Sequence, residues 1–248
     1  MRLRLWHAAA ALVLAGCGGE VHLEKMDADA LFARGQTALA AKHWDDAIAA
    51  FDRLTLQYPS FPRIQEARFD LSQAYFGKKE YVTAAGEFDR LSTDYPLGAY
   101  ADNARYMVCH SYEMLSPKVQ LDQTYTQSAI DHCNSLIAYY PNSPFTAQAR
   151  EVVQRLTEKL AEKELLAGNY YFRRHAFDSS LIYFEDVVKT YPTTNAAAQA
   201  LLQMANAYDK LGYKEDADSA RARLLKEYPG SEAAKTVKTV ASTAEAHS

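Results

Sequence analysis

The sequence is poor in glycine and has no excess of basic residues. Only ten of its 248 residues are Gly, whereas seventeen are Tyr, a balance typical of a well-packed helical protein and not of a disordered chain. Lys and Arg number 27 against 31 Asp and Glu, so the net charge is −4. The chain therefore lacks the broad positive field that attracts nucleic acid, and we expect no nucleic-acid partner.

The residue patterns of common catalytic sites are also missing. The sequence contains no His-Glu-x-x-His, no Cys-x-x-Cys, no Gly-x-Gly-x-x-Gly or Walker-type loop, and no Gly-x-Ser-x-Gly elbow. His110 and Glu113 are three residues apart on one predicted helix, but a metal site needs more ligands than these two. We therefore predict a protein that is not an enzyme, with no catalytic residue, no metal and no cofactor.

No apolar run is long enough to span a bilayer as a helix, which takes roughly 20 residues. The run from Leu5 to Leu14 follows two arginines and ends in Leu14-Ala15-Gly16-Cys17, which is the pattern of a secretory signal. Its ending resembles the bacterial lipobox, in which the Cys receives a diacylglyceryl group and becomes the new N-terminus. We expect residues 1–16 to be removed, Cys17 to carry the lipid, and residues 17–27 to form a lipidated linker. Gly18 is compatible with an outer-membrane destination, because it is not the Asp that favours inner-membrane retention in enterobacteria.

A repeated dipeptide organises the remaining chain. Tyr-Pro occurs at residues 58–59, 95–96, 140–141, 191–192 and 228–229, so the prolines are 37, 45, 51 and 37 residues apart. Each pair follows an amphipathic run, and proline ends a helix because it lacks the N–H and disfavours helical geometry in the preceding residue. Such a period is typical of stacked helical units.

The positions before each proline resemble a known repeat. Twelve residues earlier stand only small residues, which predict close helix crossings: Ala47, Ala84, Ala129, Ser180 and Ala217. Eight residues earlier stand Phe51, Phe88 and Phe184, with Cys133 and Arg221 in the third and fifth units. This arrangement resembles the tetratricopeptide repeat. We predict an all-α, right-handed superhelical solenoid of about five hairpins over 28–229 (units 28–59, 62–96, 99–141, 144–192 and 194–229), followed by a helical tail at 230–248.

Two units are longer than the others. The third holds eight extra residues around 116–124, where Pro117 favours a loop. The fourth holds fourteen extra residues, and 145–174 contains no Pro and only one Gly, so we predict one long helix of about 30 residues there. Insertions in repeat proteins often form binding surfaces, although a neutral loop expansion is the alternative at 116–124.

Two cysteines remain beside Cys17. Cys109 and Cys133 lie on the two predicted helices of the third hairpin. Packed helices can bring such a pair within bridging range in an oxidising compartment. Buried free thiols acting as small apolar residues are the alternative that we favour from the sequence alone.

The chain also resembles the BamD-like lipoproteins of outer-membrane β-barrel assembly. The resemblance rests on Tyr58-Pro59-Ser60, on Asp122-Gln123-Thr124, and on Tyr140-Pro141-Asn142-Ser143 before a long helix. The Gly168–Tyr171 run followed by Phe177 also fits the family's fourth unit. His132-Cys133 departs from the pattern, which has an aromatic residue there.

The resemblance implies a scaffold. In this family the C-terminal repeats dock the barrel subunit BamA through a POTRA domain, and the N-terminal repeats receive the β-signal of unfolded barrels. Other assembly lipoproteins are further expected partners, and the expected location is the periplasmic face of the outer membrane. The alternative is a lipoprotein scaffold of the same architecture for secretin or pilus assembly, or for recruiting cell-wall hydrolases.

The register of the repeats predicts the residues that face such partners, because first helices line the concave face of a tetratricopeptide stack. For unfolded peptides we predict Phe32, Gln36, Leu39, Phe69, Gln73 and Phe76, where aromatic rings alternate with amides. The alternative is that the Phe rings are core between hairpins. For the folded partner we predict a more polar set: Asn169, Phe172, Arg173, Asn206, Asp209 and Lys210, with the insertion residues Asp122, Gln123 and Thr124.

Overall fold

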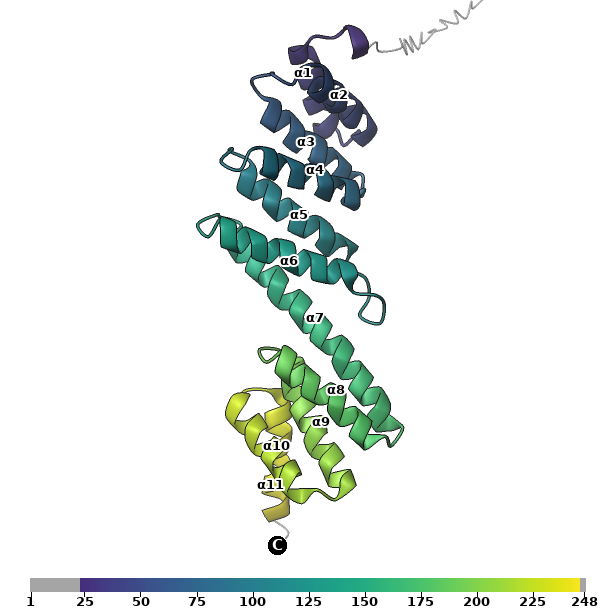
Figure 1. The fold of residues 1–248 in the computed structure, drawn as a ribbon, viewed down its shortest axis with the longest axis vertical. Helices are drawn as coiled ribbons and strands as arrows, with labels where there is room; N and C mark the ends of the chain where they lie inside the picture. The colour runs from purple at the N-terminus through teal and green to yellow at the C-terminus, as the bar shows by residue number, and fades with distance from the viewer. Residues whose placement is uncertain (1–22, 246–248) are drawn as a thin grey trace, which may run out of the picture.

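The computed structural model describes residues 23–245, which form helices and connecting turns without a strand (Figure 1). A short 3₁₀ helix, η1 (Leu23–Lys25), precedes the α-helices. These are α1 (Ala28–Ala40), α2 (Trp44–Gln57), α3 (Ile64–Gly77), α4 (Tyr81–Asp94), α5 (Ala101–Leu115), α6 (Thr124–Tyr139), α7 (Thr146–Arg173), α8 (Phe177–Thr190), α9 (Asn195–Leu211), α10 (Lys214–Glu227) and α11 (Glu232–Glu245). The predicted all-α solenoid is confirmed.

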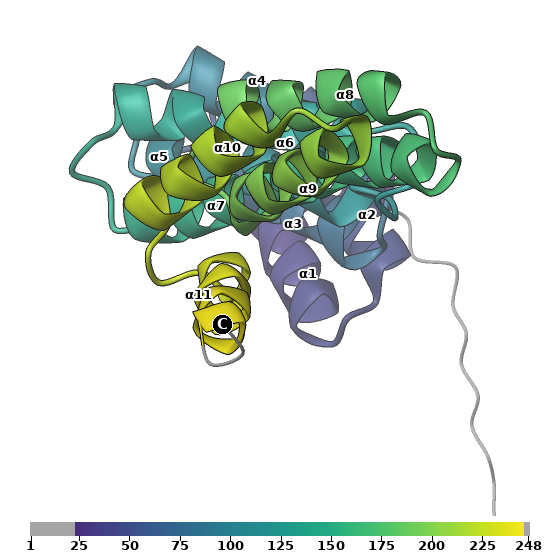
Figure 2. The ribbon, with the colours of Figure 1, turned by 90° about the horizontal axis from the view of Figure 1, so that it is seen from below.

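The helices form five consecutive hairpins, and each helix packs mainly against its neighbours along the chain. The first helices of successive hairpins also touch, as α7 and α9 do. Figure 1 shows the hairpins stacked along one long axis, and Figure 2 shows α4 and α8 on the side opposite α1. Because no hairpin can bury its apolar face alone, this stacking creates the core.

Each Tyr-Pro pair both ends a helix and joins two hairpins. The tyrosines are the C-cap residues of α2, α4, α6, α8 and α10, with φ between −125° and −130°. The hydroxyl of Tyr140 donates to the carbonyl of Pro96 at 2.9 Å, and that of Tyr228 to the carbonyl of Pro192 at 2.7 Å. These hydrogen bonds connect one Tyr-Pro turn to the turn of the preceding hairpin.

The small residues of the second helices lie at the helix crossings, as predicted. All five are fully buried: Ala47, Ala84, Ala129, Ser180 and Ala217. A larger side chain at any of these positions would have to displace a neighbouring helix, because protein interiors are close-packed.

A second contact recurs inside the hairpins. A Cβ atom added to Gly35 would lie 2.6 Å from the ring of Phe51, and one added to Gly168 would lie 2.5 Å from the ring of Phe184. The phenylalanine of the second helix therefore fills the space that the glycine of the first helix leaves open.

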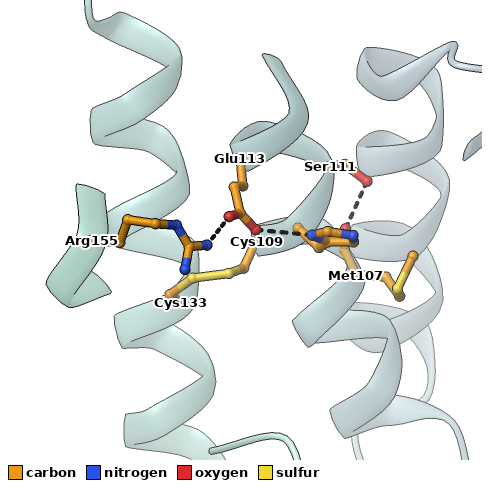
Figure 3. Close-up of a disulfide and its surroundings, with 7 residues drawn as sticks. Met107, Cys109, Ser111, Glu113, Cys133 and Arg155 are labelled. Atoms are coloured by element: carbon orange, nitrogen blue, oxygen red, sulfur yellow. Dashed lines mark hydrogen bonds and ion pairs between the residues drawn. A yellow bond between two sulfur atoms is a disulfide. The ribbon is translucent and has the colours of Figure 1, made fainter. Parts of the chain in front are cut away.

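The third hairpin replaces this contact with a covalent bond. Cys109 of α5 and Cys133 of α6 form a disulfide with a Cα–Cα distance of 5.0 Å (Figure 3). The preference for free thiols is therefore wrong. When the eight-residue insertion is allowed for, Cys109 stands at the position of Gly35 and Gly168, and Cys133 at that of Phe51 and Phe184.

The predicted long helix is confirmed as α7, whose 28 residues span about 42 Å. It belongs to two hairpins, because its first half packs on α6 and its second half on α8 and α9. At its middle, the Glu158 carboxylate accepts hydrogen bonds from the backbone N–H groups of Asn195 and Ala196 at 2.8 and 2.9 Å. This carboxylate satisfies free donors at the start of α9, where the helix dipole also favours a negative charge.

The last helix covers the end of the stack. Ala233 and Ala234 of α11 are buried and belong to the apolar cluster of the C-terminal hairpins. The helical part of the predicted tail is thereby confirmed. None of the helices from α1 to α11 combines the length and apolar character that crossing a bilayer requires. Cys17 and the predicted signal peptide lie outside the described residues.

Candidate functional site

Phe32, predicted to face a peptide, is instead part of the core. Its side chain is only 4% exposed. The ring lies 6.0 Å from that of Phe51 and 5.6 Å from that of Phe61, and the guanidinium of Arg63 covers it at 4.0 Å. The prediction is wrong here, because Phe61, which follows the Tyr-Pro turn, folds back onto the first helix.

Phe69 is buried for the same reason. It is 6% exposed, and its ring lies 5.4 Å from Phe88 and 5.1 Å from Tyr100. Tyr100 again follows a Tyr-Pro turn. The alternative, that these two Phe are core between hairpins, is the correct one, and neither ring is available to a partner without local unfolding.

Gln36, Leu39 and Gln73 are half-buried. The Gln36 amide donates a hydrogen bond to the Asp70 carboxylate, so this amide already has a partner. Burial disfavours the charged form of Asp70 and raises its pKa to about 6, and the nearby Glu66 carboxylate adds to the rise. Glu66 itself binds Arg63 at 2.7 Å. The polar side chains where α3 faces α1 therefore pair with one another.

Phe76 is half-buried and belongs to a row of stacked rings. Its ring lies 5.1 Å from that of His110; His110 stacks on Tyr106 at 6.0 Å, and Tyr106 on Phe145 at 5.3 Å. We call Phe76, Tyr106, His110 and Phe145 the aromatic row. It crosses three hairpins, from α3 over α5 to the start of α7, and all four side chains keep part of their surface in solvent.

The aromatic row includes residues that the sequence reasoning missed. Tyr106 and His110 occupy, in the third unit, the positions of Phe69 and Gln73 in the second once the eight-residue insertion is subtracted. The same shift places Glu113 at the position of Phe76. The register of the repeats would therefore have found these three residues.

His110 of the aromatic row also forms a polar cluster with Glu113 and Arg155; Figure 3 shows Glu113 and Arg155 pointing toward each other. The Nδ1 atom of His110 lies 2.9 Å from Oε2 of Glu113, and the Arg155 guanidinium donates to the other carboxylate oxygen. The hydrogen bond with His110 has the largest effect on the pKa of Glu113, and together with the bond from Arg155 it lowers that pKa and keeps the carboxylate charged. Across residues 23–245, no three His, Cys, Asp or Glu side chains gather closely enough to hold a metal ion.

The C-terminal set of predicted residues is more accessible. Arg173, Asp209 and Lys210 are exposed, and Asn169, Phe172 and Asn206 are half-buried. The ring of Phe172 lies 5.3 Å from that of Phe177. Asp209 forms an ion pair with Arg221, the residue that replaces phenylalanine in the fifth unit. This surface offers both charges and amides.

The insertion between α5 and α6 is an ordered loop, and one predicted contact residue holds it together. Gln123 is 8% exposed, and its amide donates to the carbonyls of Lys118 at 2.9 Å and Leu121 at 3.0 Å. Its own Oε1 accepts from Thr126 at 2.6 Å. The prediction that Gln123 contacts a partner is therefore wrong, because its polar atoms are used inside the loop. Asp122 and Thr124 are exposed.

The long helix fastens the same loop from the other side. Lys159 donates to Oγ of Ser116 at 2.8 Å, and Lys163 to the carbonyl of Leu121 at 2.9 Å. The loop thus lies against α7, next to Arg155 of the polar cluster.

Comparison with known proteins gives relatives over most of the chain. The outer membrane protein assembly factor BamD of Caulobacter vibrioides is 26% identical over 222 residues, covering 88% of this chain and 73% of that protein. BamD of Rickettsia prowazekii is 26% identical over 224 residues, covering 89% of this chain and 88% of that protein. BamD of Vibrio cholerae is 25% identical over 192 residues, covering 73% of this chain and 80% of that protein.

Solved structures of tetratricopeptide proteins are also similar to this chain. The structure titled "TPR2AB-domain:pHSP90-complex of yeast Sti1" has a TM-score of 0.46 at 17% identity, covering 88% of this chain and 87% of that one. That of YrrB, "a TPR protein with an unusual peptide-binding site", has a TM-score of 0.38 at 16% identity, covering 86% and 92%.

The family model YfiO, described as "Outer membrane lipoprotein", matches residues 24–224, which include the five hairpins up to the last turn of α10. The chain belongs to the YfiO family of outer membrane lipoproteins.

Proposed function

We propose that this chain is a non-catalytic scaffold lipoprotein of the machinery that assembles β-barrels into the outer membrane. It is anchored at the periplasmic face through acyl chains on Cys17 and has no other cofactor. Its C-terminal hairpins bind a BamA-like barrel subunit through a POTRA domain, and its N-terminal hairpins receive unfolded outer-membrane proteins. Other assembly lipoproteins are further partners.

The observation that carries the proposal is the presence of two different surfaces on the first helices of a chain of this family. The aromatic row offers flat apolar rings and the His110 imidazole to an extended segment. The surface around Arg173, Asn206 and Lys210 offers charges and amides, as the docking site of a folded domain does. The relatives carry the name of an assembly factor for outer membrane proteins, which favours barrel subunits as the partners.

The first experiment is a pull-down from the native envelope in mild detergent, with the bound proteins identified by mass spectrometry. Recovery of a POTRA-containing barrel protein supports the proposal. Recovery of a secretin or a cell-wall hydrolase without that barrel protein would instead favour the alternative scaffold functions.

The second experiment separates the two surfaces. Phe76→Ala with Tyr106→Ala should weaken binding of a peptide that ends in an alternating aromatic β-signal by about 1–4 kcal/mol, because aromatic anchors dominate such interfaces. The same variant should still bind the POTRA protein. Arg173→Glu with Lys210→Glu should do the opposite. Both variants must melt as the wild type does, and two well-folded variants that damage both interactions equally would refute this division.

A further inference from the structure

The two long edges of the first three hairpins differ in charge. The connections from the second helix of one hairpin to the first helix of the next are 58–63, 95–100 and 140–145, and their one charged residue, Arg63, is paired with Glu66. We call these three turns the Tyr-Pro edge; they lie along the same edge of the stack in Figure 1. The connections on the opposite edge all carry charges: Lys42, then Lys78, Lys79 and Glu80, then Lys118 and Asp122.

Large exposed apolar side chains lie in the Tyr-Pro edge or at the helix ends directly before it. Leu97 is 99% exposed, Leu56 79% and Tyr139 74%, the three highest values among the large hydrophobic residues of the described chain. Each comes from a different hairpin. Single exposed apolar residues need no explanation, but the three most exposed ones share one edge, in the connections or at the helix ends directly before them.

The N-terminal segment of the chain enters the fold at this edge. Because α1 and α2 are antiparallel, α1 starts where α2 ends, and the hydroxyl of Tyr58 donates to the carbonyl of Met26 at 3.1 Å. Leu23 is the sixth residue after Cys17, and a chain of that length spans at most about 20 Å. A lipid on Cys17 would therefore hold the end of the Tyr-Pro edge at Tyr58 within about that distance of the membrane.

We propose that the Tyr-Pro edge of the first three hairpins lies against the headgroup region of the membrane, with Leu56, Leu97 and Tyr139 inserted. This inference rests on the proposed lipid on Cys17. Three single side chains bind a bilayer weakly, but a tethered contact forms within one molecule at high effective concentration. Tyrosine suits the interface because its ring is apolar and its hydroxyl polar. Such docking orients the solenoid, with the charged edge turned toward water.

The test uses the mature lipidated protein in vesicles of phosphatidylethanolamine and phosphatidylglycerol. A polarity-sensitive fluorophore is attached at Leu97→Cys and, as the matched control on the opposite edge, at Leu121→Cys. Cys109 and Cys133 form a disulfide and do not react. Lipids with a nitroxide near the headgroup should quench the probe at position 97 several-fold more than the probe at position 121. Equal quenching at both positions, or none at position 97, would overturn the inference.

Flotation of the vesicles distinguishes this failure from failure of the anchor. Protein that floats without quenching at position 97 keeps the lipid anchor and refutes the docked edge, whereas protein that does not float refutes both. In the Leu97→Cys protein, Leu56→Ser with Tyr139→Ser should reduce quenching several-fold without changing flotation. Val82→Ser with Tyr213→Ser removes two exposed apolar residues elsewhere and should leave quenching unchanged; an equal reduction in both variants would also contradict the proposal.

Discussion

Removing the disulfide should lower the free energy of unfolding of the third hairpin substantially. The bond closes a loop with a sequence separation of 24 between Cys109 and Cys133. Constraining a loop of this length lowers the entropy of the unfolded chain by about 12 cal/mol/K, which is worth about 3.5 kcal/mol at 25 °C. We expect Cys109→Ala with Cys133→Ala to lose stability of this order, since both positions are fully buried.

Urea unfolding followed by circular dichroism at 222 nm measures this effect on the soluble chain without its lipid. At slopes of about 2–3 kcal/mol/M, the loss shifts the transition of the affected hairpins by about 1–2 M. Reducing the wild-type protein with dithiothreitol should give the same shift and should not change the alanine variant further. Coincident curves for the oxidised and reduced wild type would refute the loop-entropy reasoning.

A second variant tests the equivalence of the disulfide and the glycine–phenylalanine contact. Cys109→Gly with Cys133→Phe recreates in the third hairpin the pairs Gly35–Phe51 and Gly168–Phe184. It should be more stable than the alanine variant, because the ring fills the space above the glycine. If it is the less stable of the two, the three hairpins do not share one packing scheme.

Three further predictions follow from individual contacts. Ala84→Leu should overpack the crossing of the second hairpin and cost about 1–3 kcal/mol in urea unfolding, whereas the same change at exposed Thr83 should cost far less. Gln123→Ala should cost about 1–3 kcal/mol and expose the insertion to limited proteolysis, unlike Thr124→Ala; equal cleavage of both would argue against Gln123 as the residue that holds the loop. Asp70→Asn should be more stable than the wild type above pH 6 and lose this advantage as the pH falls toward 4. The reason is that the folded protein holds the Asp70 proton more tightly than the unfolded chain does, with a pKa of about 6, so wild-type stability rises as pH falls through that window. Unfolding curves at pH 4.5 and 8 measure the difference, and a constant gap between the two proteins would contradict it.

The helices were predictable because their ends and crossings have local chemical causes. Proline ends a helix wherever it follows the tyrosine, and the helix crossing at Ala84 has no room for a larger side chain. Both constraints select residue types that can be recognised in the sequence. The positions of Phe32 and Phe69 were less predictable. On a first helix, the residues that face a partner lie next to those that pack against the following turn. Helical periodicity alone does not show to which of these two groups Phe32 and Phe69 belong.

Two other features depended on contacts that residue type does not reveal. Gln123 has the polarity of a surface residue, but its amide is the donor that closes the loop around it. The disulfide was within reach of the sequence, because subtracting the insertion places Cys109 at the glycine position and Cys133 at the phenylalanine position. Without a structure, however, the Gly35–Phe51 contact itself was unknown, so the equivalent positions could not be used to predict the disulfide.

The length of α7 has a geometric consequence for the whole scaffold. With 28 residues it exceeds α3, which has 14, by 14 residues. At 3.6 residues per turn this is about 3.9 turns, which advances the next hairpin by about 21 Å while rotating its seat on the helix by only about 40° from a whole number of turns. The buried residues of the two halves of α7 nevertheless lie on nearly opposite faces, since Leu156 and Leu165 are nine residues, or about two and a half turns, apart. The long helix therefore packs the third hairpin on one side of its first half and the fourth and fifth hairpins on the other side of its second half, so its length separates the two groups of hairpins along its axis.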